Sequence, residues 1–185
     1  KEDFLPATGS FDLGRLETLH EQPGDEGIDL SLYEQMDAGR GEARLKVFRT
    51  GSPLSLSEIL PMLSSMGVEV VDERPYQLEG LGRPTFIYEF GLRYTETVPA
   101  HGRELFQDAL RAVWDGYNEI DGFNALVLSA GLTWRQATVL RAYAKYMRQI
   151  GFPLSQTFIE ATLAAHAGTA RLLIELFRAR FDPDG

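Results

Sequence analysis

The sequence predicts an α+β fold, in which a four-stranded sheet of antiparallel type with two helices is followed by an all-helical segment. Three observations favour this class. Residues 43–73 show an alternating stretch, then apolar residues at helical spacing, then a second stretch of strand character. Residues 28–33 and 85–94 add two further strand patterns. Beyond residue 98 the apolar residues recur at the spacing of one helix face.

A helix joins the two strands of residues 43–73. Ser55 and Glu58 predict a capping box at its start, and Gly67 predicts a left-handed cap at its end. Pro61 lacks a backbone donor, so we expect a bend in this helix or a late start. Because short connections join strand, helix and strand, the unit implies a right-handed parallel crossover.

The other elements of the first part surround this crossover. A short helix is predicted over residues 11–19, with Ser10 as its N-cap. Turns at residues 37–42 and 79–84 contain two glycines each and predict hairpins between neighbouring strands. Pro75 is expected near the end of its strand or at a sheet edge.

The predicted order is helix, strand, strand, helix, strand, strand. A ferredoxin-like fold whose first strand is moved to the end has this order, and such a move is feasible because its first and last strands are neighbours. We therefore expect a permuted ferredoxin-like sheet of the ACT-like kind, with both helices on one face. This domain is assigned to residues 1–97 and the helical segment to residues 98–185.

The helical segment contains five predicted helices. They cover residues 103–118, 123–130, 134–150, 155–166 and 169–181. Asp121 and Gly131 are the expected caps of the second, and Thr133 and Gln136 form a capping box for the third. The third helix is expected to bury one stripe, consisting of Val139, Leu140, Tyr143, Met147 and Ile150.

Composition restricts the class of protein and its partners. The chain has no cysteine, which excludes disulfides and thiolate metal sites and is typical of a cytoplasmic protein. No stretch has the length and hydropathy of a membrane span, and we see no signal peptide. Residues 1–98 carry 9 basic and 18 acidic side chains, whereas residues 99–185 carry 9 of each. An acidic first half disfavours nucleic acid and anionic membranes as partners.

The sequence contains no recognisable catalytic, cofactor-binding or metal-binding motif. Its three histidines, His20, His101 and His166, lack partners at metal-ligand spacing. The glycine pairs at residues 39–41 and 80–82 lack a third glycine and open no helix, so they indicate turns. We therefore expect no catalytic residue, no metal site and no cofactor site in this chain.

Two groups of residues are candidates for binding. Arg49, Thr50, Gly51 and Ser52 precede a helix N-terminus that could hold an anion or the carboxylate of an amino acid, although a plain capped turn is the favoured explanation. Three cations, Arg141, Lys145 and Arg148, share a helix face that could dock an acidic surface. The alternative for these cations is a solvated helix face.

Four stretches of the sequence resemble the large bacterial NAD-dependent glutamate dehydrogenases. These stretches are LKVFRTGSPLSLSEILPMLSSMGVEVVDERPYQL, FIYEFGLRY, DGFNALVLSAGLTWRQATVLRAYAKYMRQIGFPLSQ and ARLLIELFRARFDP. The resemblance implies a fragment of the long region that precedes the catalytic domain, where ACT-like modules are followed by helical segments. It also implies that the intact enzyme deaminates L-glutamate oxidatively with NAD, and that its catalytic and NAD-binding residues lie outside this chain.

Three roles follow as hypotheses. The first is a non-catalytic regulatory and assembly region, whose partners are other domains of the parent chain and other subunits of a homo-oligomer. The second is an amino-acid-sensing module that uses Arg49 to Ser52. The third is a pure interaction scaffold, in which Phe86, Tyr88 and Phe90 form an exposed edge that pairs with another subunit.

Overall fold

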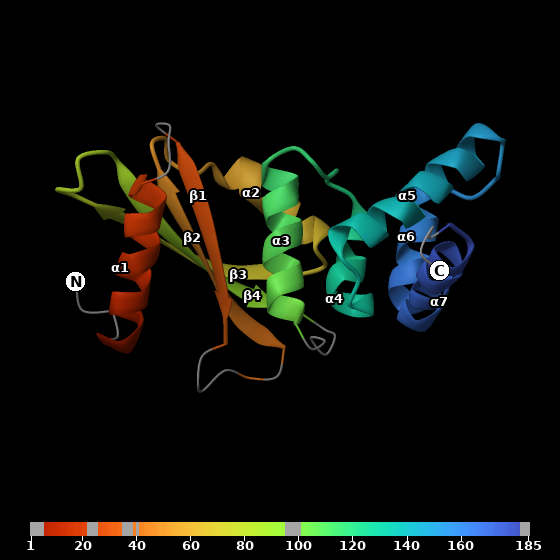
Figure 1. Cartoon of the computed structure of the whole chain (residues 1–185), viewed down its shortest axis with the longest axis horizontal. Coiled ribbons are helices and arrows are strands. Elements are labelled where there is room, and N and C mark those ends of the chain that lie inside the picture. Colours follow the sequence, from red (N-terminus) through yellow and green to blue (C-terminus); the bar gives the residue numbers. More distant parts are fainter. Residues whose placement is uncertain (1–5, 22–25, 35–38, 40, 95–100, 182–185) are drawn as a thin grey trace.

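The computed structural model describes residues 6–21, 26–34, 39, 41–94 and 101–181. It confirms the predicted class, because a four-stranded antiparallel sheet with helices is followed by an all-helical part (Figure 1). The strands are β1 (Gly27–Tyr33), β2 (Glu42–Thr50), β3 (Glu69–Leu78) and β4 (Thr85–Arg93). The helices of the described residues are α1 (Pro6–Glu21), α2 (Leu56–Ser65), α3 (Gly102–Trp114), the 3-10 helix η1 (Gly122–Ala125), α4 (Leu126–Ala130), α5 (Trp134–Gln149), α6 (Gln156–Ala165) and α7 (Ala167–Phe181).

The strand order is β1-β2-β4-β3, and all neighbouring strands are antiparallel. Since β2 and β3 are both antiparallel to β4, they run in the same direction, as the predicted crossover requires. Pro75 lies in β3 at the edge of the sheet, where its missing N–H does not interrupt a second ladder. The strand order agrees with the predicted permuted ferredoxin-like sheet. Because α3 and not α1 lies beside α2, the structure corresponds to moving the final strand to the start, and the predicted move of the first strand to the end is wrong.

The two faces of the sheet carry different helices. Leu45 and Val47 of β2 pack with side chains of α2 and α3, including Ile59 and Phe106, in the main core. Phe48 points to the opposite face and packs with Ile87, Leu16 and Leu19, where the two leucines come from α1. Figure 1 shows α1 and α3 on opposite sides of the sheet.

The expectation that the first helix shares a face with α2 is therefore wrong. The helix that lies beside α2 is α3, which follows the sheet in the sequence and contacts β1. The helical pattern of residues 11–19 could not reveal this, because an apolar stripe packs equally well on either face of a sheet. The division of the chain at residue 97 stays a prediction, and α3, beyond that boundary, packs on the sheet.

Three details of the helix starts also differ from expectation. Ser10 is not an N-cap, because α1 begins at Pro6, a residue favoured in the first helical turn. Ser55 precedes α2 but makes no side-chain capping bond, since its hydroxyl lies 2.7 Å from the hydroxyl of Ser57. α2 starts at Leu56 and continues through Pro61, so a late start is wrong and the bend stays a prediction.

The predicted exposed edge of Phe86, Tyr88 and Phe90 is also wrong. These residues belong to β4, which lies between β2 and β3 and is hydrogen-bonded on both sides. Phe90 and Tyr88 are buried, and the Tyr88 hydroxyl accepts a hydrogen bond from the Leu54 amide at 2.9 Å. We call β1 to β4 with α1, α2 and α3 the sheet module. The aromatic side chains of β4 therefore stabilise the interior of this module.

The other predicted helix caps agree well with the sequence. The Thr133 and Gln136 capping box is present, and both Gly67 and Gly131 have positive φ as expected for left-handed caps. The stretch predicted as one helix over residues 123–130 divides into η1 and α4. Among the described residues, no helix has the length and apolar character needed to cross a membrane.

The predicted buried stripe of α5 is confirmed only in part, since Val139 and Met147 are half-buried. Leu140 is buried, but its buried companions are Ala137, Arg141 and Ala144. Tyr143 and Ile150 are exposed. The helix thus turns its small residues and one arginine toward the neighbouring elements and leaves its largest apolar side chains at the surface.

Candidate functional site

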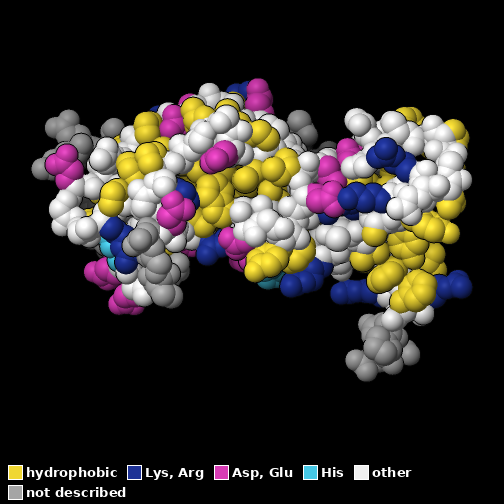
Figure 2. Space-filling model, turned by 90° about the horizontal axis from the view of Figure 1, so that it is seen from above, with side chains coloured by type: hydrophobic (Ala, Val, Ile, Leu, Met, Phe, Trp, Pro, Cys, Tyr) yellow, Lys and Arg dark blue, Asp and Glu magenta, His cyan; other side chains and the backbone are white. Residues whose placement is uncertain are grey.

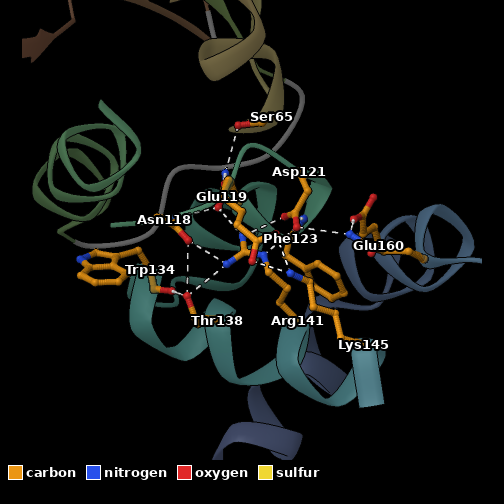
Figure 3. A network of polar contacts seen from close by, with 12 residues as sticks. Ser65, Asn118, Glu119, Asp121, Phe123, Trp134, Thr138, Arg141, Lys145 and Glu160 are labelled. Atoms are coloured by element: carbon orange, nitrogen blue, oxygen red, sulfur yellow. Dashed lines mark hydrogen bonds and ion pairs between the residues drawn. The ribbon is translucent and has the colours of Figure 1, made fainter. Parts of the chain in front are cut away.

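A buried arginine lies where the sheet module meets the helical part. Arg141 of α5 is 2% exposed. Its Nε and one terminal nitrogen donate to both carboxylate oxygens of Asp121, at 2.6 and 2.8 Å. This two-point pairing matches the planar geometry of guanidinium to that of carboxylate (Figure 3).

The remaining donors of Arg141 bind neutral side chains. One terminal nitrogen donates to Asn118 Oδ1 at 2.7 Å and to Thr138 Oγ1 at 3.1 Å, and the other donates to Asn124 Oδ1 at 2.9 Å. Together with the two bonds to Asp121, all five N–H groups have an acceptor. Such a buried charge is stable only because every donor is satisfied.

Local sequence features hold the acceptors in place. The Asp121 carboxylate also accepts from the Phe123 amide at 3.1 Å and thereby caps η1. The amide of Asn118 donates to Asn124 Oδ1 at 2.9 Å, and the hydroxyl of Thr138 donates to the Trp134 carbonyl at 2.9 Å. These bonds hold the acceptor side chains in place independently of Arg141, as a rigid polar network requires.

The network connects four parts of the fold. The Asn124 amide donates to Ser65 Oγ of α2 at 3.1 Å and to the Glu119 carbonyl at 2.7 Å. Gln156 of α6 donates to Asp121 at 3.3 Å and to Glu160 at 2.8 Å. We call this set of residues around Arg141 the arginine junction. It joins α2 of the sheet module to η1, α5 and α6.

The arginine junction changes the interpretation of the predicted cationic face. Arg141 is buried and cannot dock an external surface, so this part of the prediction is wrong. Lys145 pairs with Glu119 at 2.5 Å, and Arg148 is exposed with a 3.4 Å hydrogen bond to Gln156. Two of the three cations therefore bind acidic residues of the segment just before η1, within this chain.

The four residues predicted to bind an effector, Arg49 to Ser52, do not point toward one common space. The Arg49 guanidinium lies 4.9 Å from the Trp114 ring, and its Nε donates to the Ser52 carbonyl at 2.7 Å. Thr50 points to the other face of β2, as its alternation with Arg49 requires. Gly51, with positive φ, donates to the Pro84 carbonyl at 2.9 Å. Binding of an amino acid by these four residues stays a prediction.

One polar atom near this loop has no hydrogen-bond partner. The hydroxyl of Thr50 is fully buried and makes no hydrogen bond to any residue that the structure describes. The neighbouring Thr85 is also buried, but its hydroxyl lies 2.9 Å from His20 Nε2. An unpaired buried hydroxyl is uncommon and lowers stability relative to an apolar group of the same shape.

The described residues offer little reactive chemistry. Among them, no group of three or more His, Asp or Glu side chains could hold a metal ion. The pKa of Tyr94 is raised by burial and by the charge of Glu34. Burial lowers the pKa of Arg44, but the hydrogen bond to Asp72 and the negative charges of Asp72 and Glu89 together leave the pKa raised. Neither shift brings a group toward neutral pH, where an acid–base catalyst works.

Sequence reasoning missed most of the arginine junction. Asn118, Asn124 and Thr138 are not among the residues that the sequence predicts for a site, although two asparagines flank Asp121 directly before the apolar stretch of residues 125–130. That combination is the available signal, since a polar side chain beside buried residues needs a partner. Arg141 is the matching cation, because it shares a helix face with the small residues Ala137 and Ala144.

Comparisons with known proteins cover both parts of the chain. Residues 27–105 match the family model of the glutamate dehydrogenase ACT3 domain, and residues 118–183 match that of glutamate dehydrogenase helical motif 3. The chain is 45% identical over 192 residues to the NAD-specific glutamate dehydrogenase of Mycobacterium tuberculosis. It is 37% identical over 188 residues to the protein of that name from Halomonas elongata and 36% identical over 185 residues to the one from Pseudomonas aeruginosa. These alignments cover 98–99% of the chain but only 11–12% of the length of these relatives.

Proposed function

The chain belongs to the glutamate dehydrogenase family, as its ACT3 domain and helical motif 3, and on this premise we propose that it is a non-catalytic regulatory and assembly region. The longer enzyme would oxidise L-glutamate to 2-oxoglutarate and ammonia and pass a hydride to NAD. Glutamate and NAD would bind in parts of that enzyme outside residues 1–185.

The arginine junction is the observation that carries this proposal. It binds α2 of the sheet module to three elements of the helical part through buried and partly buried hydrogen bonds. Because a buried network with every donor satisfied has one favoured geometry, it fixes the sheet module and the helices in one orientation. A rigid connection between two modules suits a region that transmits or maintains subunit arrangement.

The use of the buried polar side chains supports a non-catalytic role. The buried side chains of Arg141, Asn118 and Asn124 all bind one another or the neighbouring backbone. A catalytic group needs a free position toward a substrate. These groups therefore serve the fold, and the chemistry of the family is assigned to other parts of the enzyme.

Two measurements test the two halves of the proposal. The purified 185-residue chain, mixed with L-glutamate and NAD, should form no NADH, and turnover would contradict the non-catalytic role. In the intact enzyme, Asn124→Leu should break the contact with Ser65 and reduce the assembled fraction measured by light scattering. The KM for NAD should stay unchanged. The control is Gln149→Leu at an exposed position of α5. A changed KM with intact assembly would count against the assembly role.

A pure scaffold is compatible with this function and has a structural basis. Large apolar side chains of α5 and α7 remain exposed, including Tyr146 and Leu176. Exposed apolar patches of this kind are typical of interaction surfaces. Amino-acid sensing by Arg49 to Ser52 stays a further proposal, to be tested by a thermal-shift screen of amino acids on the isolated chain.

A further inference from the structure

The exposed apolar surface of the helical part forms a groove between α5 and α7. Its lining consists of Val139, Ala142, Tyr143, Tyr146 and Phe177, and its volume is about 310 Å³. Figure 2 shows hydrophobic side chains gathered at the end of the molecule where Figure 1 places α5 to α7. We call this groove, with the exposed apolar residues beside it, the α5–α7 face.

The α5–α7 face is continuous across both helices. The rings of Tyr143 and Phe177 meet edge to face with centroids 6.3 Å apart, and Phe177 lies 5.1 Å from Phe181. Tyr146 is 59% exposed and Leu176 is 64% exposed. Ile150, four residues after Tyr146, and Leu173, four residues before Phe177, lie on the same helix faces and are also exposed. The face therefore extends well beyond a single scattered side chain.

The sequence pattern of both helices indicates that this face is covered in the functional protein. Ala170 and Ile174 fill the buried side of α7. Three leucines of the same helix, Leu172, Leu173 and Leu176, are nevertheless exposed. A helix with apolar residues in most directions is typically buried. On α5, Tyr143 and Ile150 belong to the stripe that the sequence predicts as buried, yet both are exposed.

Charge at this end of the molecule restricts the occupant. Residues 134–181 carry seven basic and two acidic side chains, although the whole chain has a net charge of −9. Arg141 is buried and Lys145 pairs with Glu119, so five of these basic side chains remain to attract an acidic occupant. Arg180 lies 5.9 Å from the Phe181 ring at the edge of the α5–α7 face. A second copy bound symmetrically would place the same basic surface against itself, which repulsion disfavours. An acidic occupant is instead favoured.

We propose that the α5–α7 face binds an amphipathic helix with an acidic flank, supplied by the same polypeptide outside residues 1–185. This inference rests on the proposed function, in which the chain is part of a longer enzyme. The relatives provide ample sequence for it, because the chain spans only 11–12% of their length. α5 has 16 residues and is therefore about 24 Å long, which suits an occupant of three to four turns.

Photo-cross-linking in the intact enzyme tests this proposal. Tyr146 is replaced by p-benzoylphenylalanine, and the cross-linked peptide is identified by mass spectrometry. The control carries the same group at Tyr117, an exposed aromatic residue outside the α5–α7 face. We expect a cross-link from position 146 to a peptide outside residues 1–185 that combines helical apolar spacing with aspartate or glutamate. A cross-link to residues 1–185 of another copy, or a yield no higher than at position 117, overturns the proposal.

A second variant separates occupancy from folding. Leu176→Glu should leave the isolated chain folded, because this side chain is exposed there, and should abolish the cross-link in the intact enzyme. Leu81→Glu, at an exposed leucine of the turn between β3 and β4, should retain it. If the cross-link survives Leu176→Glu, the face does not bind as proposed. NADH formation by the isolated chain would refute the non-catalytic role without affecting the cross-link, so the two failures are distinguishable.

Discussion

Replacement of Arg141 by methionine tests the central physical claim about this fold. The variant keeps an unbranched side chain of similar reach but removes all five N–H donors. Asp121, whose side chain is 13% exposed, then keeps its charge without its main partner. The side-chain oxygens of Asn118 and Asn124 also each lose a donor.

The expected loss of stability follows from these unpaired groups. Removing one partner of a buried ion pair costs about 3–5 kcal/mol, because the other charge stays buried. For a chain of this size, that loss corresponds to a decrease in melting temperature of roughly 6–20 °C. Arg141→Lys should also destabilise, since an ammonium group has only three donors and cannot match the planar carboxylate.

Urea unfolding followed by circular dichroism provides the assay. Arg148→Met is the matched control on the same helix, because Arg148 is exposed and has one long hydrogen bond. Its free energy of unfolding should change by no more than about 0.5 kcal/mol. If Arg141→Met costs less than about 1 kcal/mol relative to this control, the arginine junction does not hold the two parts together, and the reasoning is refuted.

Three further predictions concern single positions. Gly67→Ala should destabilise the chain by about 1–2 kcal/mol, because residue 67 has a positive φ. The loss should exceed that of Gly80→Ala, since the added methyl at position 67 also meets Ala125 of η1. Equal losses in urea unfolding would contradict the contact between position 67 and Ala125. Thr50→Val should leave the free energy of unfolding unchanged or raise it by up to about 1 kcal/mol, because it removes an unpaired buried hydroxyl, and a clear loss would reveal a missed partner. The raised pKa of Tyr94 means that the folded state binds the phenol proton more tightly than the unfolded state. The stability that Tyr94 contributes is therefore complete below the ordinary pKa of 10.0 and is lost as pH rises through the folded pKa. Above pH 10.0 the free energy of unfolding of the unsubstituted chain should therefore decrease more steeply than that of Tyr94→Phe. Parallel pH profiles would show that the pKa of Tyr94 is not raised.

The arrangement also explains how an acidic and a basic region share one chain. The first half is strongly acidic, whereas α5 to α7 are basic. Glu119 and Asp121 lie between these regions and pair with Lys145 and Arg141. Part of the positive charge of α5 is thus neutralised internally, whereas Arg135 and Arg148 of the same helix remain exposed.

Local features of this protein were readable from its sequence. Strand alternation in β1, β2 and β4 fixed which residues face the same side, and the Thr133 and Gln136 box marked the start of α5. Glycines with positive φ marked helix ends at Gly67 and Gly131. These features depend on neighbours within a few residues, so the sequence alone determines them.

Only the tertiary structure decided which face each helix covers and which stripe of α5 is buried. Which stripe of α5 is buried depends on the segments that pack against the helix. Asp121, 20 residues before Arg141, is the ion-pair partner that makes burial of the arginine favourable. The face chosen by α1 likewise depends on α3, which occupies the site beside α2. Burial is a property of contacts between distant segments, and a periodic pattern specifies a surface without specifying what covers it.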